Sequence, residues 1–366
     1  MAFTVLALGG DGIGPEVLEA SLKVLDTVAR SARIPIDLEE DLLHGAAWDA
    51  YGVLIRPETL ERARRSDALL VGAVGGPKWD DIVIEGGPED QDGLMKLRRE
   101  LDTFACIRHA RAWDALIDRT PYLPGRVHGA DIIVMRELCA GAMFTRTRGM
   151  DTTKSGERRA YDLNEYTDEQ IRRFARIGFE IARRRTGRVV SVDKSNVFIA
   201  GKLWREAVDD VGRSEFPDIE LTHLFADNAA YQLACRPADF DVVLADNLFG
   251  DLLSDQAGAI SGSLGMLPSA CLSDLPRTGR VQGPAIYEPV HGSAPDIAGQ
   301  GIANPVGMIL SVAMMLDYSM GAVKTARRLE AAVDRALASG YATRDLGGTH
   351  STAEMTDAVI REFRSL

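Results

Sequence analysis

Short apolar runs alternate with longer amphipathic segments along the chain. The runs at 3–8, 36–38, 68–72, 131–135, 189–192 and 241–245 have the length and composition of buried strands. Apolar residues recur at three- and four-residue intervals over 15–32, 56–65, 168–185, 201–211 and 325–338, which predicts helices. This alternation is typical of an α/β protein.

Glycine and proline interrupt the pattern at 72–79 and 283–304, where we expect loops, and such loops often carry functional sites. A further glycine-rich turn, 9–15, follows the first strand and opens the first helix. Its spacing does not fit the dinucleotide-binding fingerprint, because Pro15 stands where the third glycine is required. A tight strand-to-helix turn and a nucleotide contact are equally good interpretations of this segment alone.

The composition is that of an ordinary globular protein of 366 residues, 46% hydrophobic and 26% charged, long enough for two domains. The net charge of −12 argues against nucleic acid or an anionic membrane surface as the main partner. The four cysteines show no CxxC spacing, so reduced thiols are expected. The apolar N-terminus lacks the basic region of a signal peptide, and no apolar run approaches the length of a membrane span. We therefore expect a cytoplasmic protein.

Two acidic residues suggest a metal site. Asp251 and Asp255 lie four residues apart in a stretch that predicts a helix, so both carboxylates face the same side. Two like charges beside leucine and phenylalanine are costly unless a cation neutralises them, and oxygen ligands suit Mg²⁺ or Mn²⁺. Asp227 is a third candidate ligand. For an isolated pair of this spacing, a solvated acidic helix face is the better interpretation.

Several basic residues stand beside apolar ones. Arg98, Arg108 and Arg136 occur in expected strands or loops, where an unpaired cation would be costly. If the three converge on one pocket, they would recognise a di- or tricarboxylate through bidentate hydrogen bonds. For any one of them, a structural pair with an acidic residue is the simpler interpretation. Lys194 follows an expected strand, a position where desolvation or nearby cations can prepare a lysine for proton transfer, although a surface lysine is the alternative.

Taken together, these segments resemble the isocitrate/isopropylmalate dehydrogenase family of β-decarboxylating dehydrogenases. The resemblance covers essentially the whole chain in order, through segments 10–16, 72–79, 97–108, 136–138, 192–197, 227–230, 247–255, 262–269, 288–299, 303–305 and 345–348. It implies an α/β fold of two domains with open mixed sheets, distinct from a Rossmann fold. The cofactor-binding domain would comprise 1–103 and 262–366. The domain at 104–261 would carry the dimer contacts, the metal and the substrate.

The resemblance also implies roles for the charged residues. It implies a clamp for the malate carboxylates, formed by Arg98, Arg108 and Arg136. It implies a site for Mg²⁺ or Mn²⁺, formed by Asp227, Asp251 and Asp255. Lys194, together with Asp227, would serve catalysis by helping to take the proton of the C2 hydroxyl group. In the family, Lys194 and Asp227 reach the site from the partner subunit, so a homodimer with shared active sites is implied.

The family's own nucleotide loop is implied for 288–296, with NAD as the cofactor. Asp296 carries this preference, because a carboxylate can accept hydrogen bonds from the two ribose hydroxyls and would repel a 2′-phosphate. The residues expected to contact the cofactor are Ile13, Glu288, His291, Gly292, Ser293, Ala294, Asp296, Ile297, Asn304 and Asp345.

Leu94, Met95 and Val197 occupy the positions of the family's apolar patch for the substrate side chain. The implied reaction is oxidative decarboxylation of a 3-substituted malate, and the first candidate is (2R,3S)-3-isopropylmalate, which gives 4-methyl-2-oxopentanoate in leucine biosynthesis. Burial of an isopropyl group contributes about 2 kcal/mol, enough for preference but not for exclusion of a similar group. The alternatives are a paralogue acting on D-malate, tartrate, homoisocitrate or 3-benzylmalate, and a catalytically weakened regulatory subunit.

One wall of the expected pocket departs from the family pattern. Met143 occupies the position of the tyrosine that protonates the enol carbon, and methionine cannot donate a proton. Cys106 replaces an asparagine, and His109 replaces a proline. Either water, Lys194 or Cys139 supplies the proton, or the chain acts on another 3-substituted malate.

Overall fold

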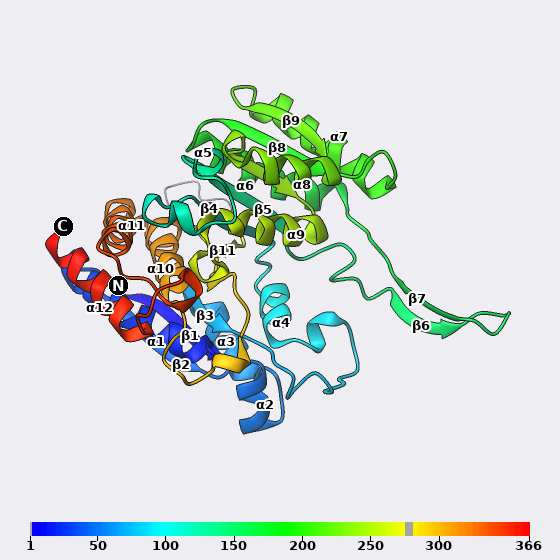
Figure 1. The fold of residues 1–366 in the computed structure, drawn as a ribbon. Coiled ribbons are helices and arrows are strands. Elements are labelled where there is room, and N and C mark those ends of the chain that lie inside the picture. Colours follow the sequence, from blue (N-terminus) through cyan, green and yellow to red (C-terminus); the bar gives the residue numbers. More distant parts are fainter. Residues whose placement is uncertain (1, 275–280) are drawn as a thin grey trace.

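The computed structural model describes residues 2–274 and 281–366. Within them, the centre of the molecule is a ten-stranded mixed sheet with the order β2-β1-β3-β12-β11-β4-β5-β10-β8-β9 (Figure 1). At its middle, β4 (Ala105–Arg111) and β11 (Pro268–Leu272) are antiparallel to each other. The expected α/β class is confirmed, and the strand order is not that of a Rossmann fold.

One half of the sheet is built from the N-terminal and the C-terminal parts of the chain. Its parallel strands are β1 (Phe3–Gly10), β2 (Ile36–Asp41), β3 (Ala68–Ala73) and β12 (Ala285–Pro289). One face is covered by α1 (Gly14–Ala32), α10 (Val306–Tyr318), α11 (Val323–Ala338) and α12 (Thr352–Ser365), which lie together in Figure 1. The other face packs against α3 (Pro57–Arg65) and α4 (Gly93–Glu100), while α2 (Gly45–Tyr51) follows β2.

The first strand is apolar without a break from Val5 to Leu8 because both of its faces are buried there. Val5 and Ala7 belong to the core that contains α1 and α10, whereas Leu6 and Leu8 pack with residues of α3 and α4. Successive strand residues point to opposite faces of a sheet, so a strand covered on both sides carries no polar alternation. This explains why the sequence shows an unbroken apolar run there.

The other half of the sheet is formed by the middle of the chain. Its parallel strands are β5 (Asp131–Glu137), β8 (Arg188–Asp193), β9 (Glu220–Phe225) and β10 (Val242–Ala245). Helices α6 (Asp168–Arg183) and α7 (Ile199–Glu215) cover one face, and α8 (Ala226–Cys235) and α9 (Asn247–Gly258) cover the other. Because these strands are parallel, their carboxyl ends share one edge of the sheet, where most of the predicted charged site residues follow.

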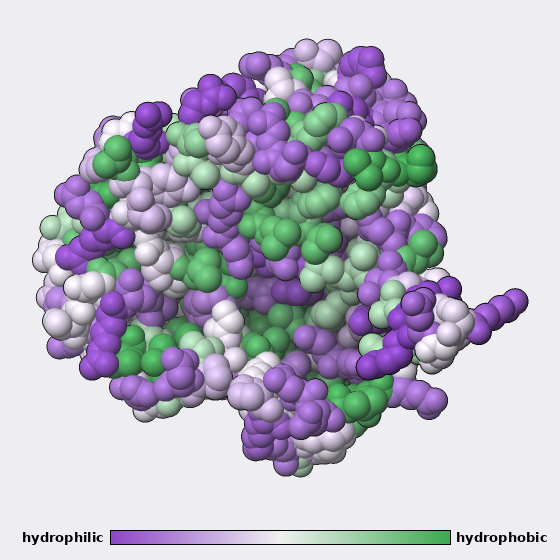
Figure 2. All heavy atoms as spheres, turned by 45° about the vertical axis from the view of Figure 1, so that its right-hand side comes forward, coloured by the Kyte–Doolittle hydropathy of each residue, from purple (hydrophilic) through white to green (hydrophobic). Residues whose placement is uncertain are grey.

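A two-stranded hairpin leaves the body of the molecule. Strands β6 (Arg148–Thr152) and β7 (Arg158–Asp162) pair only with each other, and they extend to the right in Figure 1. Nearly every residue of the hairpin is exposed. The face turned forward in Figure 2 is hollowed near its centre, between the upper and lower parts of the molecule, with this hairpin at one side. A short helix, α5 (Pro124–Val127), completes the assignment.

Some expectations from the sequence were wrong in detail. The segment 283–304 is not one loop: it contains β12 and a single 3₁₀ turn at Pro295–Ile297. The helix expected over 201–211 extends over Ile199–Glu215, and the one expected over 168–185 ends at Arg183. The division into domains at 104 and 261 stays a prediction, since the sheet continues through β4 and β11. No helix in the described part of the chain is both long and apolar enough to cross a membrane.

Candidate active site

Helix α9 presents the two predicted metal-binding carboxylates. The Asp246 side chain caps the helix by accepting a hydrogen bond from the backbone N–H of Phe249 at 2.8 Å. Asp251 and Asp255 follow one turn apart, with side chains 36% and 56% exposed. Arg108 on β4 approaches both, with Nη1 3.2 Å from Asp251 Oδ1 and 3.4 Å from Asp255 Oδ1. The sequence therefore placed these acids correctly on one helical face.

Arg136 lies near the carboxyl end of β5 and faces the same helix. Its Nη1 donates to Asp251, and its Nε donates to Asn247 Oδ1 at 2.9 Å. The approach depends on Gly250, where an added Cβ would lie 2.8 Å from the Cβ of Arg136. Two arginines therefore share one carboxylate. Burial and repulsion by Arg108 lower the pKa of Arg136 to about 10.

Arg98 faces an acid in the half of the sheet that contains β1, β2, β3 and β12. It lies on α4, not in the strand or loop expected, and its Nη2 is 2.6 Å from Glu288 Oε1 at the end of β12. Their side chains are 13% and 8% exposed. Burial opposes the charge of Arg98, but the carboxylate of Glu288 outweighs it and raises the pKa of the arginine. Glu288, which the sequence predicted to contact the cofactor, thus also balances the positive charge of Arg98, one of the three predicted clamp arginines.

Two of these arginines keep unused hydrogen-bond donors. The Nε atoms of Arg98 and Arg108 are buried, and neither has a hydrogen-bond partner among the described residues. A buried donor without a partner is costly, and native proteins leave few of them. An anionic ligand would supply the missing acceptors and would also relieve the repulsion between Arg108 and Arg136. The geometry therefore fits a carboxylate-binding site.

Lys194 and Asp227 form a separate pair. Lys194 follows β8 directly, and its Nζ donates to Asp227 Oδ1 at the start of α8. This hydrogen bond lowers the pKa of Asp227. Within residues 2–274 and 281–366 of a single chain, no three His, Cys, Asp or Glu side chains are grouped to hold a metal ion. One chain thus brings Asp251 and Asp255 together, but not Asp227.

Met143 lies against the arginine cluster. Its Sδ is 3.3 Å from Nη2 of Arg136, so the residue in place of the family's tyrosine does reach the expected wall. Cys139 is buried beside the backbone oxygen of Arg98, and burial raises the pKa of its thiol. Cys139 is therefore a weak acid for protonating a product. The Sγ atoms of Cys271 and Cys106 lie 3.1 Å apart, and the hydrogen bond from Cys271 lowers the pKa of Cys106, as do the nearby arginines.

The turn at 9–15 packs directly on the predicted nucleotide loop. The backbone N–H of Ile13 donates to Ser293 O at 2.8 Å. Gly12 has a φ of 57°, and a Cβ there would lie 2.0 Å from the same oxygen, so only glycine fits. Ala294 follows with a φ of 38°. These contacts bring together Ile13, Ser293 and Ala294, three of the residues that the sequence predicted to contact the cofactor.

The predicted nucleotide loop also keeps an unused polar atom. Nε2 of His291 is buried and has no partner among the described residues, while Nδ1 lies 2.8 Å from Gly292 O. Burial lowers the pKa of His291, which favours the neutral ring. Asp296 is exposed, and Ile297 is partly buried beside it. Asn304 Nδ2 donates to Asp345 Oδ2 at 3.0 Å, so these two predicted residues contact each other.

The predicted apolar patch is only partly assembled. Leu94 is 6% exposed and packs in the core with α3, and Met95 beside it is half-buried. Val197 is 64% exposed in the segment after Lys194. The sequence missed Ser254, whose Oγ is 2.7 Å from Nη1 of Arg108. Its position three residues after Asp251 on the same helical face was the signal that could have found it.

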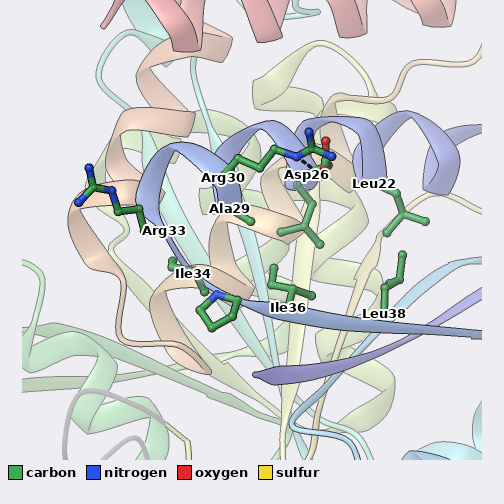
Figure 3. A pocket seen from close by; sticks show the side chains of 10 residues that line it. Leu22, Asp26, Ala29, Arg30, Arg33, Ile34, Ile36 and Leu38 are labelled. Atoms are coloured by element: carbon green, nitrogen blue, oxygen red, sulfur yellow. Dashed lines mark hydrogen bonds and ion pairs between the residues drawn. The ribbon is translucent and has the colours of Figure 1, made fainter. Parts of the chain in front are cut away.

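A cavity elsewhere holds none of these residues. It lies between α1 and the edge strand β2 and has a volume of about 510 Å³. Figure 3 shows its apolar wall, with Leu22, Ile34 and Ile36 pointing inward, and an ion pair between Arg30 and Asp26 at one side. No nucleophile, predicted metal ligand or predicted clamp arginine lines it. We therefore place the candidate active site at the arginines and not at this cavity.

Buried arginines beside paired carboxylates, on a mixed α/β sheet, define a site for a small organic acid. Residues 4–359 match the family model described as isocitrate/isopropylmalate dehydrogenase. The chain belongs to this family and is an enzyme of its β-decarboxylating dehydrogenase kind.

The comparisons extend over the full length. The chain is 46% identical over 370 residues to a 3-isopropylmalate dehydrogenase of Pseudomonas fluorescens, covering 100% of both chains. It is 48% identical to the 3-isopropylmalate dehydrogenase of Cereibacter sphaeroides, covering 98% of this chain and 97% of the relative. Among solved structures, the isocitrate dehydrogenase of Methylococcus capsulatus superposes with a TM-score of 0.86 at 28% identity, covering 99% of each chain.

Proposed function

We propose that the chain catalyses the metal- and NAD-dependent oxidative decarboxylation of (2R,3S)-3-isopropylmalate to 4-methyl-2-oxopentanoate, as required for leucine biosynthesis. The observation that carries the proposal is the pair of buried, unpartnered Nε atoms on Arg98 and Arg108, beside the carboxylates of α9. Full-length relatives named 3-isopropylmalate dehydrogenase support the choice of substrate.

The arginines would bind and orient the substrate. A malate has two carboxylates, and the unpartnered Nε atoms of Arg98 and Arg108 provide directed donors for them, with Arg136 beside Arg108 adding a third guanidinium group. Holding both carboxylates would fix the torsion about the C2–C3 bond. The bond from C3 to its carboxylate, which breaks as CO₂ leaves, would then be aligned with the carbonyl group formed at C2. The existing pairs with Glu288 and Asp251 would keep the guanidinium groups in place before substrate arrives.

The acids of α9 fit Mg²⁺ or Mn²⁺. Asp251 and Asp255 offer two carboxylates on one face, and Asp227 of the partner subunit would complete the ligand set. A bound divalent ion supplies Lewis-acid polarisation of the C2 oxygen and of the carbonyl group that forms there. Lys194 of the partner subunit would take the proton of the C2 hydroxyl group as a neutral amine and would become an ammonium group. Its hydrogen bond to Asp227 of the partner subunit would orient Nζ for this transfer.

The predicted nucleotide loop fits a dinucleotide. The His291 ring is favoured in its neutral form, so its unpartnered Nε2 can donate or accept one hydrogen bond with the adenine base of a dinucleotide. The exposed carboxylate of Asp296 favours two ribose hydroxyls over a 2′-phosphate, so NAD is the proposed cofactor. NAD, when bound there, would supply the acceptor for the hydride of C2.

A homodimer with shared active sites is part of the proposal. Large apolar side chains stand exposed close to the candidate ligands, including Val197 at 64%, Ile199 at 74% and Leu252 at 64%. A patch of this kind is typical of an interface. The protruding hairpin β6–β7 has unpaired strand edges that a second copy could complete. We propose that this dimer works in the cytoplasm.

The proposal is tested by NADH formation with Mn²⁺ and 3-isopropylmalate, beside D-malate, isocitrate, homoisocitrate, tartrate and 3-benzylmalate. Highest kcat/KM with 3-isopropylmalate supports it, and preference for another acid contradicts it. Binding of NAD and metal without turnover of any acid would instead favour the regulatory-subunit alternative.

Shared sites have their own test. D251N and K194A homodimers should both be inactive. If sites are shared, mixing and reassembling the two variants should restore about a quarter of the wild-type activity, since half of the dimers would contain one intact site. No recovery in verified heterodimers would contradict sharing.

A further inference from the structure

His44 has an unusual backbone conformation at a junction of three segments. Its φ of 56° and ψ of −124° lie where residues other than glycine are strained. The residue is 8% exposed and directly precedes α2. Strain at a buried residue persists only where the surroundings hold it in place, and the contacts of the imidazole show what holds this one.

The imidazole lies between two carboxylates. Its Nδ1 is 2.9 Å from Asp11 Oδ2, and its Nε2 is 4.0 Å from Asp92 Oδ2. A neutral imidazole has one N–H donor and would turn a lone pair toward one of these acids, whereas an imidazolium can donate toward both. Burial works to lower the pKa of His44, but Asp11 and Asp92 outweigh it and raise that pKa.

Other charges near this junction are already paired. On α2, Asp49 accepts from Lys78 of the loop after β3 at 2.5 Å. At the end of β2, Asp41 is paired with Arg56 at 2.8 Å. The charge of the His44 ring is therefore governed by Asp11 and Asp92.

Asp11 ties the imidazole to the turn beside the predicted nucleotide loop. It is 3% exposed, and its carboxylate also accepts hydrogen bonds from the backbone N–H groups of Gly45, Ala46 and Gly75, at 3.1, 2.8 and 2.8 Å. The same turn contains Ile13, which is bonded to the nucleotide loop through its backbone.

Asp92 ties the imidazole to the helix that carries Arg98. Its Oδ1 caps α4 by accepting hydrogen bonds from the backbone N–H groups of Leu94 and Met95, at 2.8 and 2.9 Å. Its other oxygen, Oδ2, faces the imidazole of His44. The start of α4 also packs closely on the backbone of His44, because a Cβ added to Gly93 would lie 3.3 Å from the backbone nitrogen of His44.

We propose that protonated His44 is a positioning residue that fixes the start of α4, and with it Arg98, relative to the turn at 9–15. The proposal rests on the proposed function, in which Arg98 binds a substrate carboxylate. As pH rises through the pKa of His44, Nε2 loses its proton and the link to Asp92 is lost. The KM for substrate then rises, while kcat changes little because His44 touches no reacting atom.

The first test compares wild type, H44G and H44N by steady-state kinetics across pH. Glycine adopts the observed φ and ψ without strain, so H44G should fold at least as well as wild type. We expect KM for 3-isopropylmalate to rise about tenfold in H44G and H44N, with kcat within about twofold, and to lose its pH dependence. H223N is the matched control, since His223 makes a similar 3.0 Å contact with Asp209 far from α4. An unchanged KM and pH profile in both variants would overturn the proposal, as would an effect confined to kcat.

The second test does not need turnover. Amide hydrogen exchange of residues 93–100 should speed up in wild type and in H223N alike as pH passes the pKa of His44, because both keep His44. This rise should exceed the intrinsic rise with pH seen in H44N, where exchange should be fast throughout. If no acid is turned over, the proposed function fails while this measurement still decides the role of His44. Exchange in H44N equal to wild type at every pH would overturn the proposal.

Discussion

Arg98 offers a direct measure of how firmly the clamp is held without substrate. In R98M the carboxylate of Glu288 stays buried, 8% exposed, with the thiol of Cys271 at 3.7 Å as its remaining side-chain neighbour. Removing one partner of a buried pair costs 3–5 kcal/mol, and because the Arg98 side chain is 13% exposed we expect the lower end, about 3 kcal/mol.

Urea unfolding followed by tryptophan fluorescence and circular dichroism measures this effect. The double variant R98M/E288Q should recover most of the lost free energy, because no buried charge remains unpaired. R64M is the matched control: Arg64 pairs with Glu100 on the surface, both side chains about 40% exposed, and its loss should cost below about 1 kcal/mol. A loss of unfolding free energy in R98M no larger than in R64M would refute the reasoning.

Three further predictions concern chemistry, cofactor choice and pH. M143Y restores a phenolic proton donor beside Arg136 and should raise kcat about tenfold or more, whereas M143F should not; stopped-flow and steady-state rates decide. D296K should shift the ratio of kcat/KM from NAD toward NADP by at least about tenfold, read from initial rates with the two cofactors. Burial works to raise the pKa of Asp131, but His109 and Arg185 outweigh it and lower that pKa. The ionised carboxylate therefore stabilises the fold at pH values above its unfolded-state pKa, and this stabilisation is lost as pH falls through its folded-state pKa. D131N should therefore be less stable than wild type by about 1 kcal/mol near neutral pH, since the side chain is half-exposed, and the gap should close in acid.

The sequence predicted strands best where both faces are buried. The run from Val5 to Leu8 shows no polar residue because α1 and α3 cover its two faces. Strand β4 was missed because charged and polar side chains interrupt it. Arg108 faces the site, whereas His109 contacts Asp131 and Arg111 pairs with Asp334. Helix α10 was missed because Val306 to Leu316 are all buried, so the segment has no polar face from which to read a helical period. The β6–β7 hairpin buries neither face and left no apolar pattern.

The candidate site was predictable in its residue types and less so in its contacts. The spacing of Asp251 and Asp255 sufficed to place both on one helical face. For the arginines, the structural interpretation is confirmed for two of them, because Arg98 and Arg136 pair with acids of the chain. The carboxylate clamp stays a prediction, and Nε of Arg98 is buried without a partner among the described residues. His44 gave no signal in the sequence, because its role depends on a backbone conformation and on carboxylates distant along the chain.

The most direct test of the central claim is the stoichiometry of the reaction with 3-isopropylmalate. Purified protein with Mn²⁺ and NAD should release CO₂ and NADH in equal amounts, with 4-methyl-2-oxopentanoate as the organic product, and D251N should lower the rate by about a hundredfold or more. NADH without CO₂ would show a simple dehydrogenase, and full activity in D251N would contradict the proposed metal site.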